Sequence, residues 1–245
     1  HNGESWIKAC LDSLISQTHS CELEIIVVDD ASTDRSREVV KGYADPRVRI
    51  VEIQPNVGVA EARNRGVDEA RFDWIAFNDQ DDVWLPTKLE DQIQLLERHP
   101  NAKGCVGANG RLASDSVSQW SFSIGPWRWT PVDIPHMRSP PWFDPLFDGH
   151  VYLQSLLVRR DVAQMTRFRF GLKLMEDIDF LMRLGSVAKL VCVSKPVFLY
   201  RLSFENTTAP GKMRAQEFLA NQAYNRLVIG ARRRGNPGGT GKPLP

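Results

Sequence analysis

The first hundred residues alternate between helical periodicity and short apolar runs. Residues 4–17 place Trp6, Cys10 and Leu14 on one helical row, which is the period of an amphipathic helix. Residues 24–28 then form the run Glu-Ile-Ile-Val-Val, which is typical of a parallel strand buried on both faces. The pattern therefore predicts a helix that leads into a buried strand.

The same alternation continues through the next eighty residues. It predicts helices over 34–44, 59–70 and 86–99, and strands over 48–53, 72–77 and 103–108. Strands that alternate with helices of this length form a sheet from βαβ units. We therefore expect an α/β fold over residues 1–110, with a Rossmann-like, mostly parallel sheet flanked by helices.

The chain changes character after residue 110. Tryptophan, phenylalanine and proline interleave over 113–149 without a clear period, which we interpret as a long ordered excursion. Later patterns predict an apolar segment over 151–158, helices over 161–167, 177–184 and 211–233, and a strand pair over 188–194 and 197–202. We expect a second half over residues 111–233 and a Gly/Pro-rich basic tail over 234–245.

Composition narrows the class of protein. The formal net charge of +1 indicates no overall attraction to nucleic acid, so we expect no nucleic-acid partner. The four cysteines form no CxxC pair, so neither a zinc site nor a disulfide framework is indicated. We found no apolar run long enough for a membrane span. We predict a cytoplasmic location, with the inner face of the membrane as an alternative reached through parts outside this chain.

Acidic residues follow two of the predicted strands. Asp29 and Asp30 end the first strand, and Asp79-Gln80-Asp81-Asp82 ends the third. In open α/β sheets ligands collect beyond the carboxyl ends of the strands, so we expect both clusters in one cleft. Mg²⁺ and Mn²⁺ take one or two carboxylates together with substrate phosphates, which suits the later cluster. The alternative is a solvated acidic turn that caps the following helix.

Several motifs occur in a fixed order along the chain. They are NGE at 2–4, EIIVVDDASTD at 24–34, NVG at 56–58 with ARNRG at 62–66, DQDDVW at 79–84 followed by Pro86, Lys88 and Leu89, and MEDIDFLMR at 175–183. The series over residues 1–100 resembles family 2 glycosyltransferases of the GT-A fold. The last motif resembles the Glu-Asp motif of that family.

The resemblance implies an activity. It implies transfer of a sugar from a nucleotide-diphosphate donor, expected to be a UDP-sugar, to the hydroxyl of a carbohydrate or glycolipid acceptor. It further implies inversion at the anomeric carbon of the sugar, a Mn²⁺ or Mg²⁺ cofactor, and a place in polysaccharide or cell-surface glycan synthesis. Residues 1–110 would be the nucleotide-sugar-binding half, and 111–233 the acceptor-binding half with the catalytic base.

The resemblance also assigns roles to residues. Asp177 maps onto the catalytic base, which takes the proton of the acceptor hydroxyl, and Glu176 would orient the acceptor or the base. Asp79 and Asp81 map onto the metal motif, with Asp81 in direct contact and Asp79 also near the donor. The alternative for Glu176 and Asp177, with Asp179, is that they complement a helix N-terminus.

Nucleotide contacts follow in the same way. Asp30, with Asp29 beside it, maps onto the contact with uracil and ribose, and the alternative is a helix cap. Arg63 maps near the nucleotide, and the alternative is a surface arginine. Asp82 belongs to the acidic cluster over residues 79–82, and the alternative is that it caps the following helix. Many relatives carry a Tyr-Arg-x-His element, and residues 200–203 lack its histidine. Arg201 would substitute as a phosphate contact, and the alternative is pairing with an acidic residue.

Two features depart from the family or vary within it. Relatives carry an apolar strand before the position of Asn2, and this strand is apparently missing here, where it would line the nucleotide pocket. Trp129, in the aromatic stretch, is a candidate for stacking on the acceptor, whereas a buried packing flap is the alternative. Two rival functions are a degenerate nucleotide-sugar binder without turnover and a phosphorelay receiver domain.

Overall fold

The computed structural model describes residues 1–113, 120–121, 151–172 and 175–202. The predicted helix over 211–233, the tail over 234–245 and most of the aromatic stretch lie outside this range. Residues 1–202 cluster as one unit. Strand β5 (Gly104–Ala113) crosses the expected boundary at residue 110 and pairs with β8 (Leu190–Leu202), so this boundary is not marked by a break in the sheet.

The first two strands form a two-stranded sheet of their own. Helices α1 (Ile7–Ile15) and α2 (Ser36–Lys41) pack against a parallel pair of strands, β1 (Ile25–Asp30) and β2 (Val48–Ile53). Their shared core consists of buried apolar residues from all these elements except β2, namely Ile7, Leu11, Ile25 and Val40. Strand β1 ends at Asp30, as the sequence pattern predicted.

The remaining strands form a six-stranded sheet with the order β3-β7-β5-β8-β4, and β6 pairs with β5. Besides β5 and β8, the strands are β3 (Trp74–Ala76), β4 (Val83–Trp84), β6 (Trp120–Ser121) and β7 (Leu157–Arg159). The other elements are α3 (Val59–Glu69), α4 (Lys88–Arg98), the 3₁₀ turn η1 (Leu153–Ser155), α5 (Arg160–Thr166) and α6 (Glu176–Val187).

The α/β class is confirmed, but the larger sheet is mixed rather than mostly parallel. The pairs β1–β2 and β5–β8 are parallel, whereas β3–β7, β4–β8, β5–β6 and β5–β7 are antiparallel. The added antiparallel partners are two or three residues long. Strands this short carry too little periodicity to reveal their direction.

The expected strand pair near the end of the described chain is wrong. Strand β8 runs without a turn from Leu190 to Leu202, and Pro196 lies opposite Ala108 where the register with β5 shifts. A proline cannot donate a ladder hydrogen bond and is tolerated at such an irregularity. Lys195 and Pro196 therefore interrupt the apolar pattern without ending the strand.

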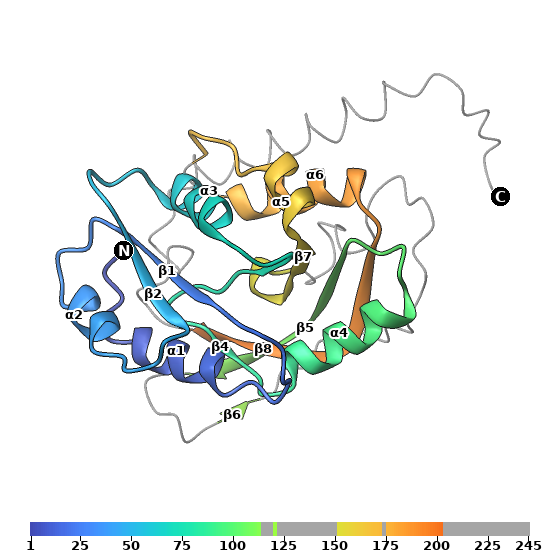
Figure 1. Ribbon diagram of the computed structural model, residues 1–245, viewed down its shortest axis with the longest axis horizontal. Coiled ribbons are helices and arrows are strands. Elements are labelled where there is room, and N and C mark those ends of the chain that lie inside the picture. Colours follow the sequence, from blue (N-terminus) through green and yellow to red (C-terminus); the bar gives the residue numbers. More distant parts are fainter. Residues whose placement is uncertain (114–119, 122–150, 173–174, 203–245) are drawn as a thin grey trace. The chain divides into compact units, whose positions relative to one another are not determined.

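The six-stranded sheet is buried on both faces, and its strands divide their side chains between two cores. Val106, Val158 and Leu190 belong to the core shared with α3, α5 and α6. Their chain neighbours Cys105, Leu157 and Val191 belong to the core beneath α4. Successive residues of a strand point to opposite faces, which accounts for this alternation. Figure 1 shows α3, α5 and α6 on one side of the sheet and α4 on the other.

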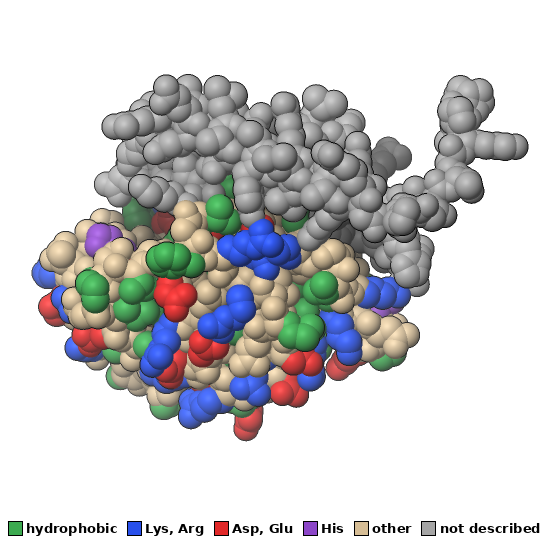
Figure 2. Space-filling view, turned by 90° about the horizontal axis from the view of Figure 1, so that it is seen from above, with side chains coloured by type: hydrophobic (Ala, Val, Ile, Leu, Met, Phe, Trp, Pro, Cys, Tyr) green, Lys and Arg blue, Asp and Glu red, His purple; other side chains and the backbone are tan. Residues whose placement is uncertain are grey.

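The surface carries charges of both signs. Acidic and basic side chains lie interspersed over the described part of the face shown in Figure 2. Elsewhere on the described surface, exposed ion pairs include Lys8 with Asp12 and Arg167 with Asp68. Within the ranges that the structure describes, no helix has the length and apolar character needed to cross a bilayer.

A trio of phenylalanines in the first core offers a test of the fold. Phe180 is fully buried, stacks on Phe168 with ring centroids 4.1 Å apart, and meets Phe77 edge to face. Truncation should leave a cavity, so we expect Phe180→Ala to lower the free energy of unfolding by about 3–5 kcal/mol in chemical denaturation. Phe170→Ala, at an 82% exposed position, is the matched control and should change it little. Equal effects of the two would contradict this packing.

Candidate active site

Asp30 holds the loop that begins helix α3. Its two carboxylate oxygens accept hydrogen bonds from the backbone N–H groups of Val57 and Gly58, at 2.7 and 2.8 Å. Gly58 has a φ of 88°, a conformation that favours glycine and lets the chain turn into α3. Asp30, which was predicted to contact the nucleotide, therefore orders residues 56–58 and, through them, the start of the helix that carries Arg63.

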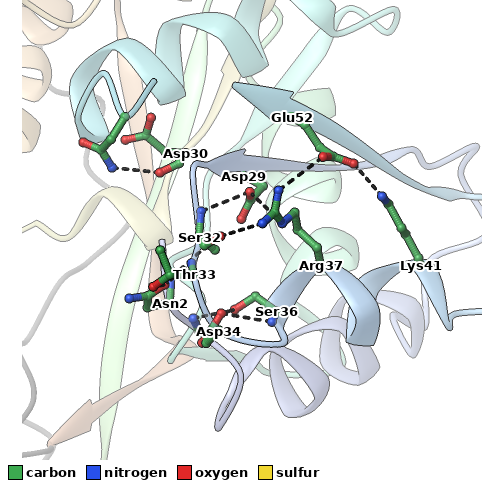
Figure 3. A network of polar contacts seen from close by, with 12 residues as sticks. Asn2, Asp29, Asp30, Ser32, Thr33, Asp34, Ser36, Arg37, Lys41 and Glu52 are labelled. Carbon is green, nitrogen blue, oxygen red and sulfur yellow. Dashed lines mark hydrogen bonds and ion pairs between the residues drawn. The ribbon is translucent and has the colours of Figure 1, made fainter. Parts of the chain in front are cut away.

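Asp29 lies in the network of polar contacts drawn in Figure 3. Its carboxylate accepts a hydrogen bond from the N–H of Ser32 and lies 3.7 Å from the Nε atom of Arg37. The Arg37 guanidinium also meets Glu52, which pairs with Lys41 at 2.7 Å. This network fixes the loop after β1 against α2 and β2.

The N-terminal segment connects the loops after β1 and β3. The backbone N–H groups of Asn2 and Gly3 donate to the hydroxyl groups of Ser32 and Ser36, at 3.0 and 2.7 Å. The amino group of His1 donates to Oε1 of Gln80 at 3.2 Å. Both acidic clusters therefore border the same N-terminal segment, although no described hydrogen bond or ion pair joins Asp29 or Asp30 to the second cluster.

Arg63 joins the two motifs that the sequence placed far apart. One terminal nitrogen donates to Oδ1 of Asp79 at 2.8 Å, and the other donates to Oε1 of Glu176 at 2.7 Å. The guanidinium also lies over the ring of Phe168, 5.5 Å from its centroid. Arg63 is therefore not a plain surface residue, because its side chain is only 13% exposed and satisfies two carboxylates.

The charged groups around Arg63 shift one another's pKa values. Burial raises the pKa of Glu176, the neighbouring Asp177 raises it further, and Arg63 opposes both effects. Burial likewise raises the pKa of Asp177, again opposed by Arg63. Helix α6 begins at Glu176, so both carboxylates also lie in its first turn, where negative charge is favoured. The alternative of a helix-terminal role is thus compatible with a site role.

Asp82 does not cap the following helix. It is buried, and its Oδ1 atom accepts a hydrogen bond from the backbone N–H of Arg201 at 2.9 Å. Burial raises its pKa well above the usual range, with further increases from Asp79 and Asp81. Its second oxygen, Oδ2, is buried without a hydrogen-bond partner in the described chain.

Arg201 lies directly behind this acidic turn. Its Nε donates to the backbone carbonyl of Asp81 at 2.8 Å, and its guanidinium stacks 4.2 Å from the ring centroid of Trp6. The Asp81 side chain is half-buried. Burial raises its pKa, and the negative charge of Asp79 raises it further. The acidic turn over residues 79–82 therefore lies beside the guanidinium of Arg201, whose position is fixed by Asp81 and Trp6.

The donor set suits a cation that is held only partly by protein. Among the described residues, no group of three or more His, Cys, Asp or Glu side chains could hold a metal ion by itself. Mg²⁺ and Mn²⁺ bound with a nucleotide need only one or two carboxylates, because phosphate oxygens and water complete the shell. Burial raises the pKa of Asp81 and of Asp82, and neighbouring carboxylates raise both further, so a bound cation would offset the cost of ionising them. The residues present therefore fit a metal shared with a diphosphate.

Gln154 is a site residue that sequence analysis missed. Its Nε2 atom donates to Oδ2 of Asp79 at 2.5 Å, so both oxygens of that carboxylate hold a donor. The only signal in the sequence was one amide inside the apolar segment 151–158. Trp129 lies outside the described residues. The structure thus gathers Asp79, Glu176 and Arg63 with Gln154, and places Asp29 and Asp30 in loop contacts of their own.

Comparison with known proteins adds a family match. The family described as "Glycosyl transferase family 2" matches residues 1–156. The chain is 32% identical to the uncharacterized glycosyltransferase YibD of Escherichia coli over 66% of this chain and 48% of that protein. It is 36% identical to the E. coli UDP-Glc:alpha-D-GlcNAc-diphosphoundecaprenol beta-1,3-glucosyltransferase WfgD over 39% and 38%. The chain thus spans about half the length of these relatives or less.

Solved structures show the same fold. Staphylococcus aureus TarS in complex with UDP-GlcNAc matches with a TM-score of 0.68 and 18% identity, over 95% of this chain and 64% of that one. The mannosyltransferase PcManGT of Pyrobaculum calidifontis, in complex with GDP-Man and Mn²⁺, matches with a TM-score of 0.60 and 18% identity, over 100% and 63%. The expected GT-A type of fold is confirmed by these likenesses.

Removal of Arg63 tests whether it holds the site together. Arg63→Met leaves Asp79 and Glu176 without their cation, so we expect the free energy of unfolding at neutral pH to fall by about 3–5 kcal/mol. Arg65→Met, on the same helix at a side chain that is 55% exposed, is the control and should have little effect.

The loss should depend on pH in one direction. Without Arg63 the folded pKa of Glu176 rises further above the usual 4.5, so its ionisation opposes folding. The deficit of Arg63→Met should be largest above that raised pKa and should shrink as the pH falls towards 4.5. A deficit that stays constant in denaturation curves across this interval would contradict the assignment.

Proposed function

The chain belongs to glycosyl transferase family 2, and we propose that it moves a sugar from a nucleotide-diphosphate donor to an acceptor hydroxyl with a divalent metal ion. One observation carries the proposal. Arg63 joins Asp79, in the acidic turn after β3, to Glu176, which is 113 residues from Arg63 and begins α6. The metal-side motif with Asp79 and the acceptor-side motif with Glu176 thus both bind the guanidinium of Arg63, and a single transfer site requires them to be this close.

The donor end of the site would be formed by the two acidic loops. Asp81, with Asp79, would hold Mn²⁺ or Mg²⁺, which when bound stabilises the negative charge of the departing diphosphate. Asp29 and Asp30 would accept hydrogen bonds from the nucleoside, since a carboxylate has lone pairs left after binding two N–H groups. Arg201, fixed against Trp6, would face the phosphates.

The acceptor end would be formed by the first turn of α6. Asp177 would take the proton of the acceptor hydroxyl as its oxygen attacks the anomeric carbon, with inversion. Burial raises the pKa of Asp177, which makes it a stronger base than an exposed aspartate. Glu176, held by Arg63, would orient the acceptor or Asp177. Trp129 would contribute stacking on the acceptor sugar.

The relatives guide the substrate classes. WfgD is named for UDP-Glc and a diphosphoundecaprenol acceptor, and TarS binds UDP-GlcNAc, which supports a UDP-sugar donor and a carbohydrate or glycolipid acceptor. PcManGT is named with Mn²⁺, which supports a divalent metal. We place the reaction in polysaccharide or cell-surface glycan synthesis on the cytoplasmic side.

Asp177→Asn separates turnover from donor binding. Loss of the base should lower release of UDP from a UDP-sugar and acceptor by about 10²–10⁴-fold. Asn keeps the size of the side chain, so metal-dependent UDP binding should remain. The wild-type rate should also fall as the pH drops through the raised pKa of Asp177, because the base must be ionised. Asp161→Asn, at an exposed carboxylate on α5, is the control.

Wild-type protein that binds UDP with Mn²⁺ but releases none from any UDP-sugar would instead favour a degenerate binder. The same panel should include GDP-sugars, because a preference for these would overturn the choice of UDP while leaving the reaction class intact.

Asp81→Asn tests the metal assignment separately. The amide cannot supply a carboxylate to Mn²⁺, so the increase in UDP affinity that Mn²⁺ produces in the wild type should shrink by at least about tenfold. Binding is measured by calorimetry with and without Mn²⁺. Asp73→Asn, at an exposed aspartate beside β3, provides the control. Metal dependence that survives in Asp81→Asn would exclude Asp81 as a direct ligand.

A further inference from the structure

Gln154 is the middle residue of η1, a turn that is buried throughout. Leu153, Gln154 and Ser155 are 1%, 5% and 0% exposed. The side chain of Gln154 nevertheless leaves the apolar core, because its Nε2 atom donates to Oδ2 of Asp79 at 2.5 Å. A buried turn far along the chain thus contacts the metal-side motif.

The other half of the same amide has no partner. The Oε1 atom of Gln154 is buried and accepts no hydrogen bond from any described residue. A buried polar atom without a partner disfavours the folded state, and an apolar side chain of similar size would avoid this cost. Stability alone therefore does not explain a glutamine here, whereas a need for its N–H donor at Asp79 does.

The turn that presents Gln154 is itself held by buried polar groups. The backbone carbonyl of Ser155 accepts hydrogen bonds from Nε2 of Gln92 at 2.7 Å and from Nζ of Lys88 at 3.2 Å. Lys88 also donates to Oε1 of Gln92 at 2.6 Å, and both side chains are fully buried. Helix α4 thereby fixes η1, and Gln154 approaches Asp79 from a rigid support.

Arg63 and Gln154 together determine how the Asp79 carboxylate is oriented. Arg63 donates to Oδ1 at 2.8 Å, and Gln154 donates to Oδ2. One donor would leave the carboxylate free to rotate about its terminal bond, whereas a donor on each oxygen fixes its plane. Each oxygen keeps a lone pair for a further ligand.

We propose that Gln154 is a positioning residue that, with Arg63, orients Asp79 for the metal and diphosphate of the donor. The inference rests on the proposed function, because it assigns Asp79 to that end of the site. Gln154 acts through Asp79, so its removal should weaken the binding of metal and nucleotide together without preventing folding.

Calorimetric titration of the full chain with UDP, in the presence of Mn²⁺, tests the role. Gln154→Leu removes the donor at similar volume, and we expect UDP to bind about 10-fold to 100-fold more weakly, the loss typical of a hydrogen bond to a charged group. Gln94→Leu, at an exposed glutamine on α4, is the matched control and should bind like the wild type. The Tm of each variant without UDP reports folding, and Gln154→Met replaces Gln154→Leu if the branched side chain lowers it.

Gln154→Glu distinguishes orientation from packing. It keeps the size of the side chain but replaces the N–H donor with a second carboxylate beside Asp79, and adjacent carboxylates repel each other. In the presence of Mn²⁺ we therefore expect UDP to bind at least as weakly to Gln154→Glu as to Gln154→Leu.

The outcomes separate this role from the proposed function. Wild-type affinity in either Gln154→Leu or Gln154→Glu would overturn the positioning role. Tighter binding by Gln154→Glu would also overturn it, because the position would then act by charge on the metal. If the wild type shows no metal-dependent binding of either UDP or GDP, the proposed function fails, and the positioning role, which rests on it, fails with it.

Discussion

A single guanidinium between two carboxylates determines how this site is assembled. Arg63 lies on α3, Asp79 in the turn after β3, and Glu176 at the start of α6. A buried cation is tolerated only where partners compensate its lost hydration, so the Arg63 side chain can be buried only where the other two segments meet α3. Asp30 contributes from a distance, because its carboxylate binds the N–H groups that begin α3. The acidic loops after two different strands thus depend on one helix.

Sequence patterns predicted elements better than they predicted pairings. The period of apolar residues was enough to find α1, β1, β2, α3, α4 and β5, because each obeys a local rule. It failed at β8, where Lys195 and Pro196 read as a break, and for the direction of the short strands. Whether a strand pairs in the parallel or the antiparallel direction depends on its partner elsewhere in the chain, and a strand of two or three residues is too short for its sequence to indicate that partner.

The candidate site shows the same division. The motifs revealed the carboxylates and Arg63, but not which atoms they would meet. A helix cap was the alternative for Asp82, which is instead bonded to the backbone of Arg201, 119 residues away. Gln154 stood out only as one amide in an apolar segment, because its role depends on Asp79, 75 residues earlier. Side chains that act through a distant partner are visible only once the fold brings that partner close.

The amine that helps to hold η1 has a further effect on the protein as a whole. Burial of Lys88 lowers its pKa from 10.5 to about 7, so the folded chain releases a proton that the unfolded chain keeps. Between these two values the unfolded state binds more protons, and the free energy of unfolding therefore increases as the pH rises through that interval. The folded protein should accordingly be favoured by mild alkalinity through a group beneath the sheet, whatever the pH optimum of its chemistry.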